Sequence, residues 1–382
     1  MSMVCLSDTI YLMDVTSSIA FFISIFSVTA VLLYFTQKLK SKPLRIILTV
    51  LTLAIPVIIS GIRYNVGIDF PEYEKIFNNI IAGRPAWDHI LEPTFYLFSW
   101  VSDFLTGNSA VLYTIYAGIF VGFSYLFIKK VLPQNHVPLA TFVMLMTTFP
   151  MSMNIIRQSA AIAVCVFATW FIINKKPAWY AVSIILASTL HFSAIVLLPL
   201  YFIRYLFKNS KNQLRNIYIT LGIAVVLCIT APFILQLLTS IPVFNHYSYL
   251  ADFEQSFYIS ARLLANLFII ILVWLFAKKH IVKNQTKLII TTLFSLGICL
   301  QTISFFMRGT GRISLYLTSL LPIVLIYMLD AKNNKFPDMF KKIFRYKYFW
   351  HTIIVIISLA YFIGICLFDN SGYNILPYET IF

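Results

Sequence analysis

Charged residues are scarce in this chain. Only 11% of its 382 residues are Asp, Glu, Lys or Arg, against 60% that are hydrophobic, whereas a soluble domain carries roughly 25% charged residues. This composition excludes a soluble globule and predicts an all-α, polytopic membrane protein. The length allows about a dozen crossings of ~20 residues each. Because no internal repeat or low-complexity tract interrupts the chain, we expect a single integral membrane domain over 1–382.

Cysteine pairs and cofactor motifs are also absent from the sequence, and acidic residues are few. The five cysteines form no CxxC pair, so they imply neither a disulfide framework nor a metal site. No P-loop, dinucleotide fingerprint or metal-ligand spacing is present, and we expect no cofactor. The 29 Lys and Arg exceed the 14 Asp and Glu, which gives a formal net charge of +15. In a membrane chain this excess reflects basic cytoplasmic loops and does not indicate nucleic acid.

The basic loops define a predicted topology. Apolar runs alternate with stretches rich in Lys and Arg, which should be cytoplasmic. Counting crossings between these stretches gives about twelve transmembrane helices, with both termini outside. The predicted crossings are 16–36, 44–62, 109–128, 137–152, 155–173, two limbs within 177–206, 216–239, 258–277, 288–306, 312–330 and 348–368.

The two limbs within 177–206 form an unusual pair. Basic residues lie at both ends of this stretch, at Lys176 and Arg204, so the chain must cross and return with its apex near His191. Each limb has only ~14 residues, which is short for a crossing. We therefore expect a broken or re-entrant pair near His191, whose backbone needs a protein or water lining.

The segment 63–107 differs from the crossings. Apolar residues recur at helical spacing over 71–81 with polar residues between them, which predicts an amphipathic helix on a surface. The stretch 92–106 is ambiguous, and we place it at the outer interface to keep the parity of crossings. The whole segment is then an outer amphipathic element.

Several polar residues in or beside apolar segments are not explained by the bias of Lys and Arg toward the cytoplasm. On the predicted topology each lies at the outer face or just below it, where arginines oppose the bias and require another explanation. These candidate site residues are Arg63, Asp69, Asn154, Arg157, Gln158, His191, Arg308, Arg312 and, in the C-terminal tail, Tyr378.

Arginines dominate this set. Arg157 lies within an apolar helix, where a charge costs about 2.5–3.5 kcal/mol, so it either forms a structural ion pair, with Asp69 as a candidate, or binds an anion. Arg308 and Arg312 suit a phosphate or diphosphate, because the guanidinium fork matches phosphate oxygens. The alternative for these two is a snorkelling pair at the interface.

Two residues are candidate bases. His191 lies at the predicted apex of its pair, where a histidine can accept a proton. A lone histidine in an apolar region is otherwise most often a hydrogen-bonded structural residue. Asp69 is the other candidate, and its alternative role is a loop carboxylate paired with Arg63.

In order along the chain, these motifs resemble the EpsG family, the Wzy-like polymerases of bacterial exopolysaccharide, capsule and O-antigen. The resemblance covers most of the length and departs at Phe70, where such families often have Tyr. The segments that carry it are RYNVGIDFPEY (63–73), EPTFYLF (92–98), NIIRQSAAIAV (154–164), HFSAIVLLPLYF (191–202), GRISLYL (311–317) and NILPY (374–378).

The resemblance implies a multi-pass glycosyltransferase of the bacterial cytoplasmic membrane with a GT-C-like architecture. Such enzymes transfer an oligosaccharide from polyprenyl diphosphate to a new lipid-linked repeat unit, at the outer face. The arginines of the set would hold the diphosphate, and His191 or Asp69 would accept the proton. No metal is chemically required, because the leaving group is already a good one. Expected partners are the lipid-linked oligosaccharide, the bilayer, a chain-length regulator and export machinery.

Two other functions stay open. A lipid-linked oligosaccharide flippase or transporter would also keep arginines in a cavity, but it should show two related halves and charges through its depth. An O-antigen ligase would use the same donor with another acceptor, and such ligases usually carry a large outer loop late in the chain. The corresponding loop here, 240–257, is short.

Overall fold

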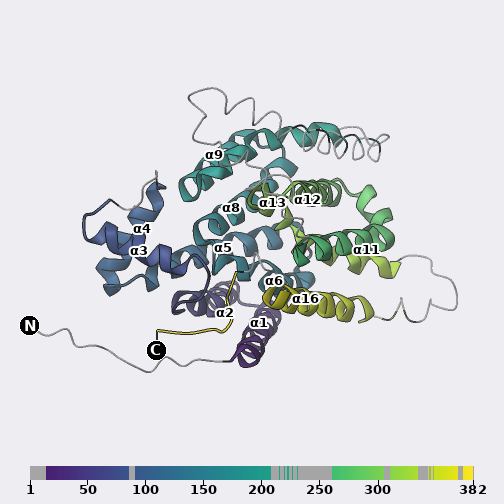
Figure 1. The fold of residues 1–382 in the computed structure, drawn as a ribbon. Coiled ribbons are helices and arrows are strands. Elements are labelled where there is room, and N and C mark those ends of the chain that lie inside the picture. The colour runs from purple at the N-terminus through teal and green to yellow at the C-terminus, as the bar shows by residue number, and fades with distance from the viewer. Residues whose placement is uncertain are drawn as a thin grey trace, which may run out of the picture.

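The computed structural model of the chain is a bundle of helices (Figure 1). It describes residues 14–85, 91–207, 260–304, 310–333, 348–368 and 373–381, with isolated residues between 215 and 230 and at 343 and 346. Within these ranges there is no strand, and the only β-type pairing is an antiparallel bridge between Arg63 and Thr380. The prediction of an all-α chain is therefore confirmed.

The helices vary widely in length. The α-helices are α1 (Val15–Gln37), α2 (Lys42–Gly61), α3 (Phe70–Ile81), α4 (Pro93–Thr106), α5 (Ala110–Val131), α6 (Val137–Thr147), α7 (Phe149–Ser152), α8 (Ile156–Ile173), α9 (Pro177–Leu190), α11 (Ala261–Lys283), α12 (Gln285–Ile303), α13 (Thr310–Thr318), α14 (Leu321–Ile326) and α16 (Phe349–Phe368). The 3-10 helices are η1 (Gln134–His136), η2 (Phe192–Phe207) and η5 (Tyr327–Asn333).

Six helices in the described part of the chain, namely α1, α2, α5, α8, α11 and α16, are long and apolar enough to cross a membrane. A bent pair at 311–318 and 321–331 raises the number to seven if it counts as one span. A multi-pass membrane protein is thus supported, but a count of twelve is not. The predicted crossing 216–239 lies largely outside the described residues. The one at 137–152 is divided at Thr148 into α6 and α7, two residues before Pro150, which has no N–H to continue the helix.

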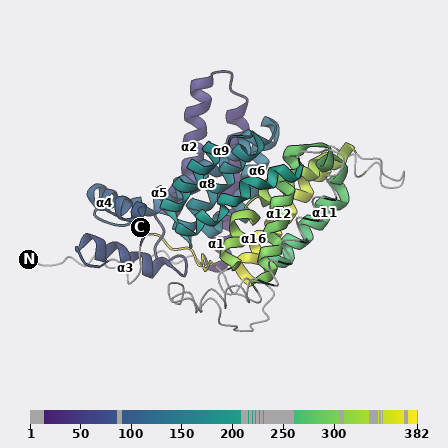
Figure 2. The ribbon, with the colours of Figure 1, turned by 90° about the horizontal axis from the view of Figure 1, so that it is seen from above.

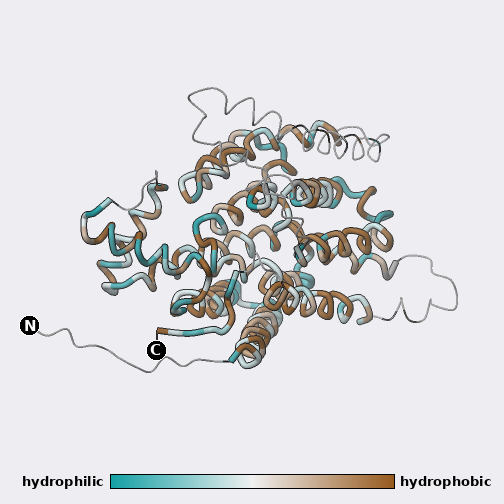
Figure 3. The backbone as a smooth tube through the Cα atoms, in the orientation of Figure 1, coloured by the Kyte–Doolittle hydropathy of each residue, from teal (hydrophilic) through white to brown (hydrophobic). Residues whose placement is uncertain are grey.

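The predicted amphipathic segment forms two short helices beside the bundle, α3 and α4 (Figures 1 and 2). At 1.5 Å per residue they are about 20 Å long, which is too short for the hydrocarbon core of a bilayer. Hydrophilic residues gather on this part of the chain, whereas α1 and α16 are mostly hydrophobic (Figure 3). The helix predicted over 71–81 is confirmed, since α3 covers Phe70–Ile81.

The predicted break near His191 is also present. Helix α9 ends at Leu190 and η2 begins at Phe192, while His191 itself has an extended backbone with φ −157° and ψ 119°. The two limbs pack against each other. The chain therefore reverses direction at a histidine, which places this side chain at the end of both limbs.

Helix α8 lies at the centre of the bundle. It packs against α5, α9 and α13, and 14 of its 18 residues are buried. Small residues near its start, Ser159, Ala160 and Ala161, allow neighbouring helices to approach closely. As a result the polar residues that begin this helix are enclosed by other elements.

The C-terminal tail returns to the residues that follow α2. The backbone N–H of Tyr64 donates to the carbonyl of Glu379 at 3.0 Å, and the N–H of Ile381 donates to the carbonyl of Ile62 at 3.0 Å. The tail thus closes over the loop between α2 and α3, the loop that leads to Asp69.

Candidate functional site

Glu92 joins two basic side chains that lie far from it in the sequence. Its Oε2 accepts a hydrogen bond from Nη1 of Arg157, and its Oε1 lies 2.7 Å from Nδ1 of His191. The backbone N–H of Phe192 also donates to Oε1, at 3.3 Å. Glu92 itself is only 2% exposed. We call Glu92, Arg157 and His191 the Glu92 cluster.

Each member of the Glu92 cluster is held at the end of an element. Glu92 immediately precedes α4, which begins at a proline, a residue suited to the first turn of a helix. Arg157 is the second residue of α8, and His191 stands at the break between α9 and η2. The Thr94 hydroxyl donates to the carbonyl of Thr189 at 2.6 Å, which fixes the start of α4 against the end of α9.

The Glu92 carboxyl is ionised in this setting. Burial raises its pKa, but the hydrogen bond from His191 and the positive charge of Arg157 outweigh burial and hold the pKa below its usual value of 4.5. A carboxylate can only accept hydrogen bonds, so the shared proton belongs to Nδ1 of His191. In the neutral form of the imidazole Nε2 is the acceptor, and 23% of the side chain is exposed.

Aromatic rings flank the guanidinium of Arg157. Its central carbon lies 5.7 Å from the ring centres of both Tyr73 and Phe95, and ring faces attract cations. The structure therefore gives Arg157 the ion pair that sequence analysis allowed, but with a different partner. The carboxylate is that of Glu92, which immediately precedes α4, and not that of Asp69, which immediately precedes α3.

Asp69 lies close to the Glu92 cluster at the start of α3. Its backbone N–H donates to Oδ1 of Asn154 at 2.8 Å, which ties the loop to the residues before α8. Burial raises the pKa of Asp69, and the charges of Arg312 and Arg157 oppose that rise. The half-buried carboxyl is therefore within electrostatic reach of both arginines.

The loop before Asp69 approaches the start of α8 so closely that only glycine fits at position 67. Gly67 has a φ of +102°, and a Cβ added there would lie 2.8 Å from the carbonyl oxygen of Met153. Its N–H donates to the carbonyl of Asn374 in the tail at 3.0 Å. A side chain at this position would push the loop away from Asn154.

Gln158 links α8 to α13. Its Nε2 donates to the backbone carbonyl of Arg312 at 2.9 Å, while the side chain of Arg312 is exposed. Arg312 is therefore held by its backbone and has a side chain that can reach a ligand. Arg308, which was predicted with it, lies outside the described residues.

Arg63 and Tyr378 contact other residues than those of the Glu92 cluster. Arg63 is 1% exposed, donates to the backbone carbonyl of Ser60, and has its guanidinium carbon 4.1 Å from the ring centre of Tyr113. The Tyr378 hydroxyl donates to the carbonyl of Ile59 at 2.7 Å. These contacts join α2, α5 and the tail. We therefore propose that both side chains hold the loop after α2, whereas the sequence predicted that they contact substrate.

Glu92 is not among the site residues predicted from the sequence. The motif EPTFYLF begins with this glutamate. Acidic residues are rare in this chain, so one that stands directly before an apolar segment is itself an indication of a site. An acid at the start of an apolar segment needs a basic partner. Among the described residues, no three or more His, Cys, Asp or Glu side chains are placed to hold a metal ion.

Comparison with known proteins identifies a family for this chain. The EpsG family matches residues 45–380, a range that includes the Glu92 cluster, Asp69 and Arg312. No curated protein and no solved structure matches the chain.

Proposed function

Because this chain belongs to the EpsG family, we propose that it polymerises oligosaccharide repeat units carried on a polyprenyl diphosphate. The product would be an exopolysaccharide, a capsule or an O-antigen. The enzyme would be a Wzy-type glycosyltransferase of the bacterial cytoplasmic membrane, with a GT-C-like arrangement of its helices. The observation that supports this proposal most is the 2.7 Å contact between Glu92 and His191, beside Arg157 and near Asp69.

Glycosyl transfer from a lipid diphosphate needs a proton acceptor and a cation. The bond between the anomeric carbon and the diphosphate oxygen breaks, and the diphosphate leaves with the electron pair. A hydroxyl oxygen of the acceptor sugar forms the new bond to that carbon. In our proposal its proton passes to Nε2 of His191, because Glu92 keeps the proton of the ring on Nδ1. Glu92 is then a positioning residue.

The leaving diphosphate would be held by arginine. Fixed cations stabilise charge that develops on a leaving group. Arg157 shares its charge with Glu92, so the exposed Arg312 is the stronger candidate for direct contact with phosphate oxygens. Asn154 and Gln158 would act indirectly, by fixing the loop of Asp69 and the backbone of Arg312.

Asp69 is the alternative proton acceptor in this scheme. Burial raises its pKa, and a carboxyl with a raised pKa is a better proton acceptor. It could therefore serve as the base, or accept a hydrogen bond from a sugar hydroxyl while His191 acts as the base.

Charge distribution supports an outer position for the site. Helix α5 ends in Lys129 and Lys130, and α8 runs from Arg157 toward the basic turn at 175–176. Basic ends are cytoplasmic in most membrane proteins. The Glu92 cluster, at the start of α8, would then face the other side of the membrane, where lipid-linked repeat units are joined.

An assay with a native lipid-linked repeat unit tests the proposal. Purified protein in lipid nanodiscs should convert the unit into a ladder of longer products on a gel, and Arg312→Gln should lose that ladder while remaining folded. The exposed Lys75→Gln serves as the control and should keep it. Translocation of single units without growth would contradict the proposal and favour a flippase. A single transfer to an unrelated acceptor would favour a ligase.

A further inference from the structure

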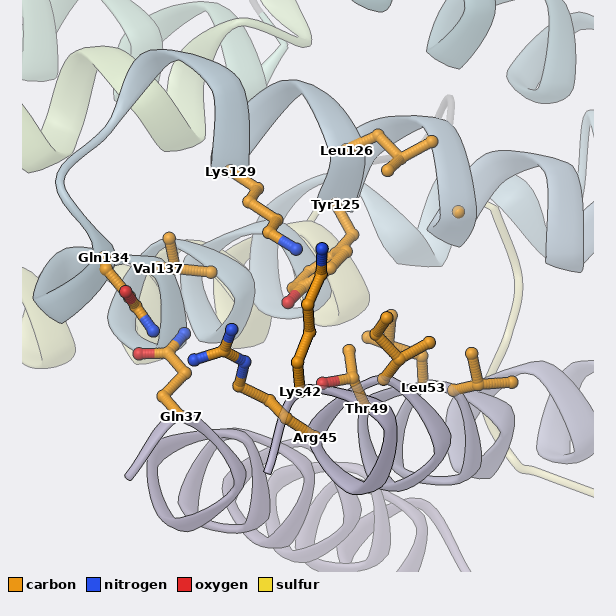
Figure 4. Close-up of a pocket in the computed structure, with 13 residues that line it drawn as sticks. Gln37, Lys42, Arg45, Thr49, Leu53, Tyr125, Leu126, Lys129, Gln134 and Val137 are labelled. Carbon is orange, nitrogen blue, oxygen red and sulfur yellow. The ribbon is translucent and has the colours of Figure 1, made fainter. Parts of the chain in front are cut away.

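A cavity with basic side chains lies between the start of α2 and the end of α5. The cavity has a volume of about 450 Å³, and Lys42 and Arg45 of α2 and Lys129 of α5 point into it (Figure 4). None of the residues that line the cavity is acidic. The described residues offer no ion-pair partner to these three cations, so the cavity carries uncompensated positive charge.

One side of this cavity is apolar and faces outward. Ile46, Val50 and Leu126 line it and are 51%, 60% and 42% exposed. They belong to helices long and apolar enough to cross a membrane, where exposed apolar side chains contact acyl chains. The cavity therefore combines a cationic end with an apolar flank open to lipid.

The position of the cavity separates it from the Glu92 cluster. It lies at the start of α2, whose other end leads to Arg63, and a helix of that length is about 30 Å long. The basic residues around the cavity place it at the cytoplasmic headgroup level. It is thus about one membrane thickness from the proposed active site, and its occupant need not be the substrate.

We propose that this cavity binds a phosphate ester, and that the ester is the headgroup of an anionic membrane lipid. Arginine matches phosphate oxygens with its fork and lysines add point charges, while Gln37 and Gln134 supply further donors at the same end. The acyl chain would cover the apolar flank, which free phosphate would leave bare. Basic pockets between transmembrane helices on the cytoplasmic side are suited to such headgroups.

Retention of lipid by the purified full-length protein tests this inference. Native mass spectrometry should detect one phosphatidylglycerol that remains bound after detergent exchange, and added phosphatidylglycerol should raise the thermal unfolding temperature. The triple variant Lys42→Gln/Arg45→Gln/Lys129→Gln should lose both effects, with binding weakened about tenfold or more. The matched control is Lys278→Gln/Lys279→Gln/Lys283→Gln, which removes three exposed cations at the end of α11 and should retain both effects.

Two further arms identify the source of the phosphate. Glycerol phosphate and inorganic phosphate, which lack acyl chains, should displace the lipid only weakly. Displacement at concentrations close to those of the lipid would overturn the lipid assignment and leave a site for a soluble phosphate. Equal retention of phosphatidylglycerol by both triple variants would overturn the site itself. None of these readouts depends on polymerisation, so their failure is distinct from failure of the proposed function.

Discussion

Nδ1 of His191 lies 2.7 Å from Oε1 of Glu92, although the two residues are 99 positions apart in the chain. The same carboxylate binds Arg157 through its other oxygen. One buried acid therefore fixes both the orientation of a candidate base and the position of a cation. Such convergence on a single carboxylate makes Glu92 the residue on which the geometry of the site depends.

Replacement of Glu92 should change how stability depends on pH. The folded state lowers the pKa of Glu92, so the carboxylate contributes stability above its usual pKa of 4.5, and this contribution is lost as the pH falls through the lower folded value. Glu92→Gln should lower the free energy of unfolding at pH 7 by about 3–5 kcal/mol, since a buried arginine loses its partner. It should also flatten the acid limb of the profile.

Thermal unfolding in detergent between pH 3 and pH 7 measures this effect. Glu72→Gln is the control, because the Glu72 side chain is 45% exposed and, within the described part of the chain, its ion pair is with the exposed Lys75. Parallel profiles for the wild type and Glu92→Gln would show that the ion pair does not stabilise the fold.

Asp69 should behave in the opposite way. Burial raises its pKa, so the folded state favours the protonated form, and stability decreases as the pH rises through the raised value. Asp69→Asn should therefore keep or increase the unfolding temperature at pH 7, while the rate of polymerisation falls. A clear loss of stability in this variant, with the rate per folded molecule unchanged, would assign Asp69 a structural role only.

Local patterns predicted part of this architecture well. The spacing of apolar residues over 71–81 is helical, and α3 covers Phe70–Ile81. Basic residues on both sides of 177–206 required a reversal, which occurs at His191. Both features depend on residues close together in the sequence, so they can be read from it directly.

Partners of buried charges were harder to predict. Arg157 meets Glu92 across 65 positions, and nothing in the local sequence distinguishes Glu92 from Asp69 as its partner. Arg63 likewise looked available for a ligand, but it is buried against Tyr113. These pairings depend on tertiary packing. A short motif does not show which side chains from distant segments pack against the end of a helix.

Arg63 should therefore be needed for folding rather than for substrate. Arg63→Lys loses the hydrogen bond from Nε to the carbonyl of Val66 and weakens the contact with Tyr113, at a cost of about 2 kcal/mol. The unfolding temperature should fall, whereas the polymerisation rate per folded molecule should stay close to that of the wild type. A folded Arg63→Lys protein with a strongly reduced rate would return Arg63 to the substrate site.

The most direct test is the initial rate of polymerisation by purified His191→Gln, normalised to the folded protein. If His191 accepts the proton of the attacking hydroxyl, the rate should fall about 100-fold to 10,000-fold, while the unfolding temperature stays near that of the wild type. A rate equal to that of the wild type would contradict the assignment of His191 as the base.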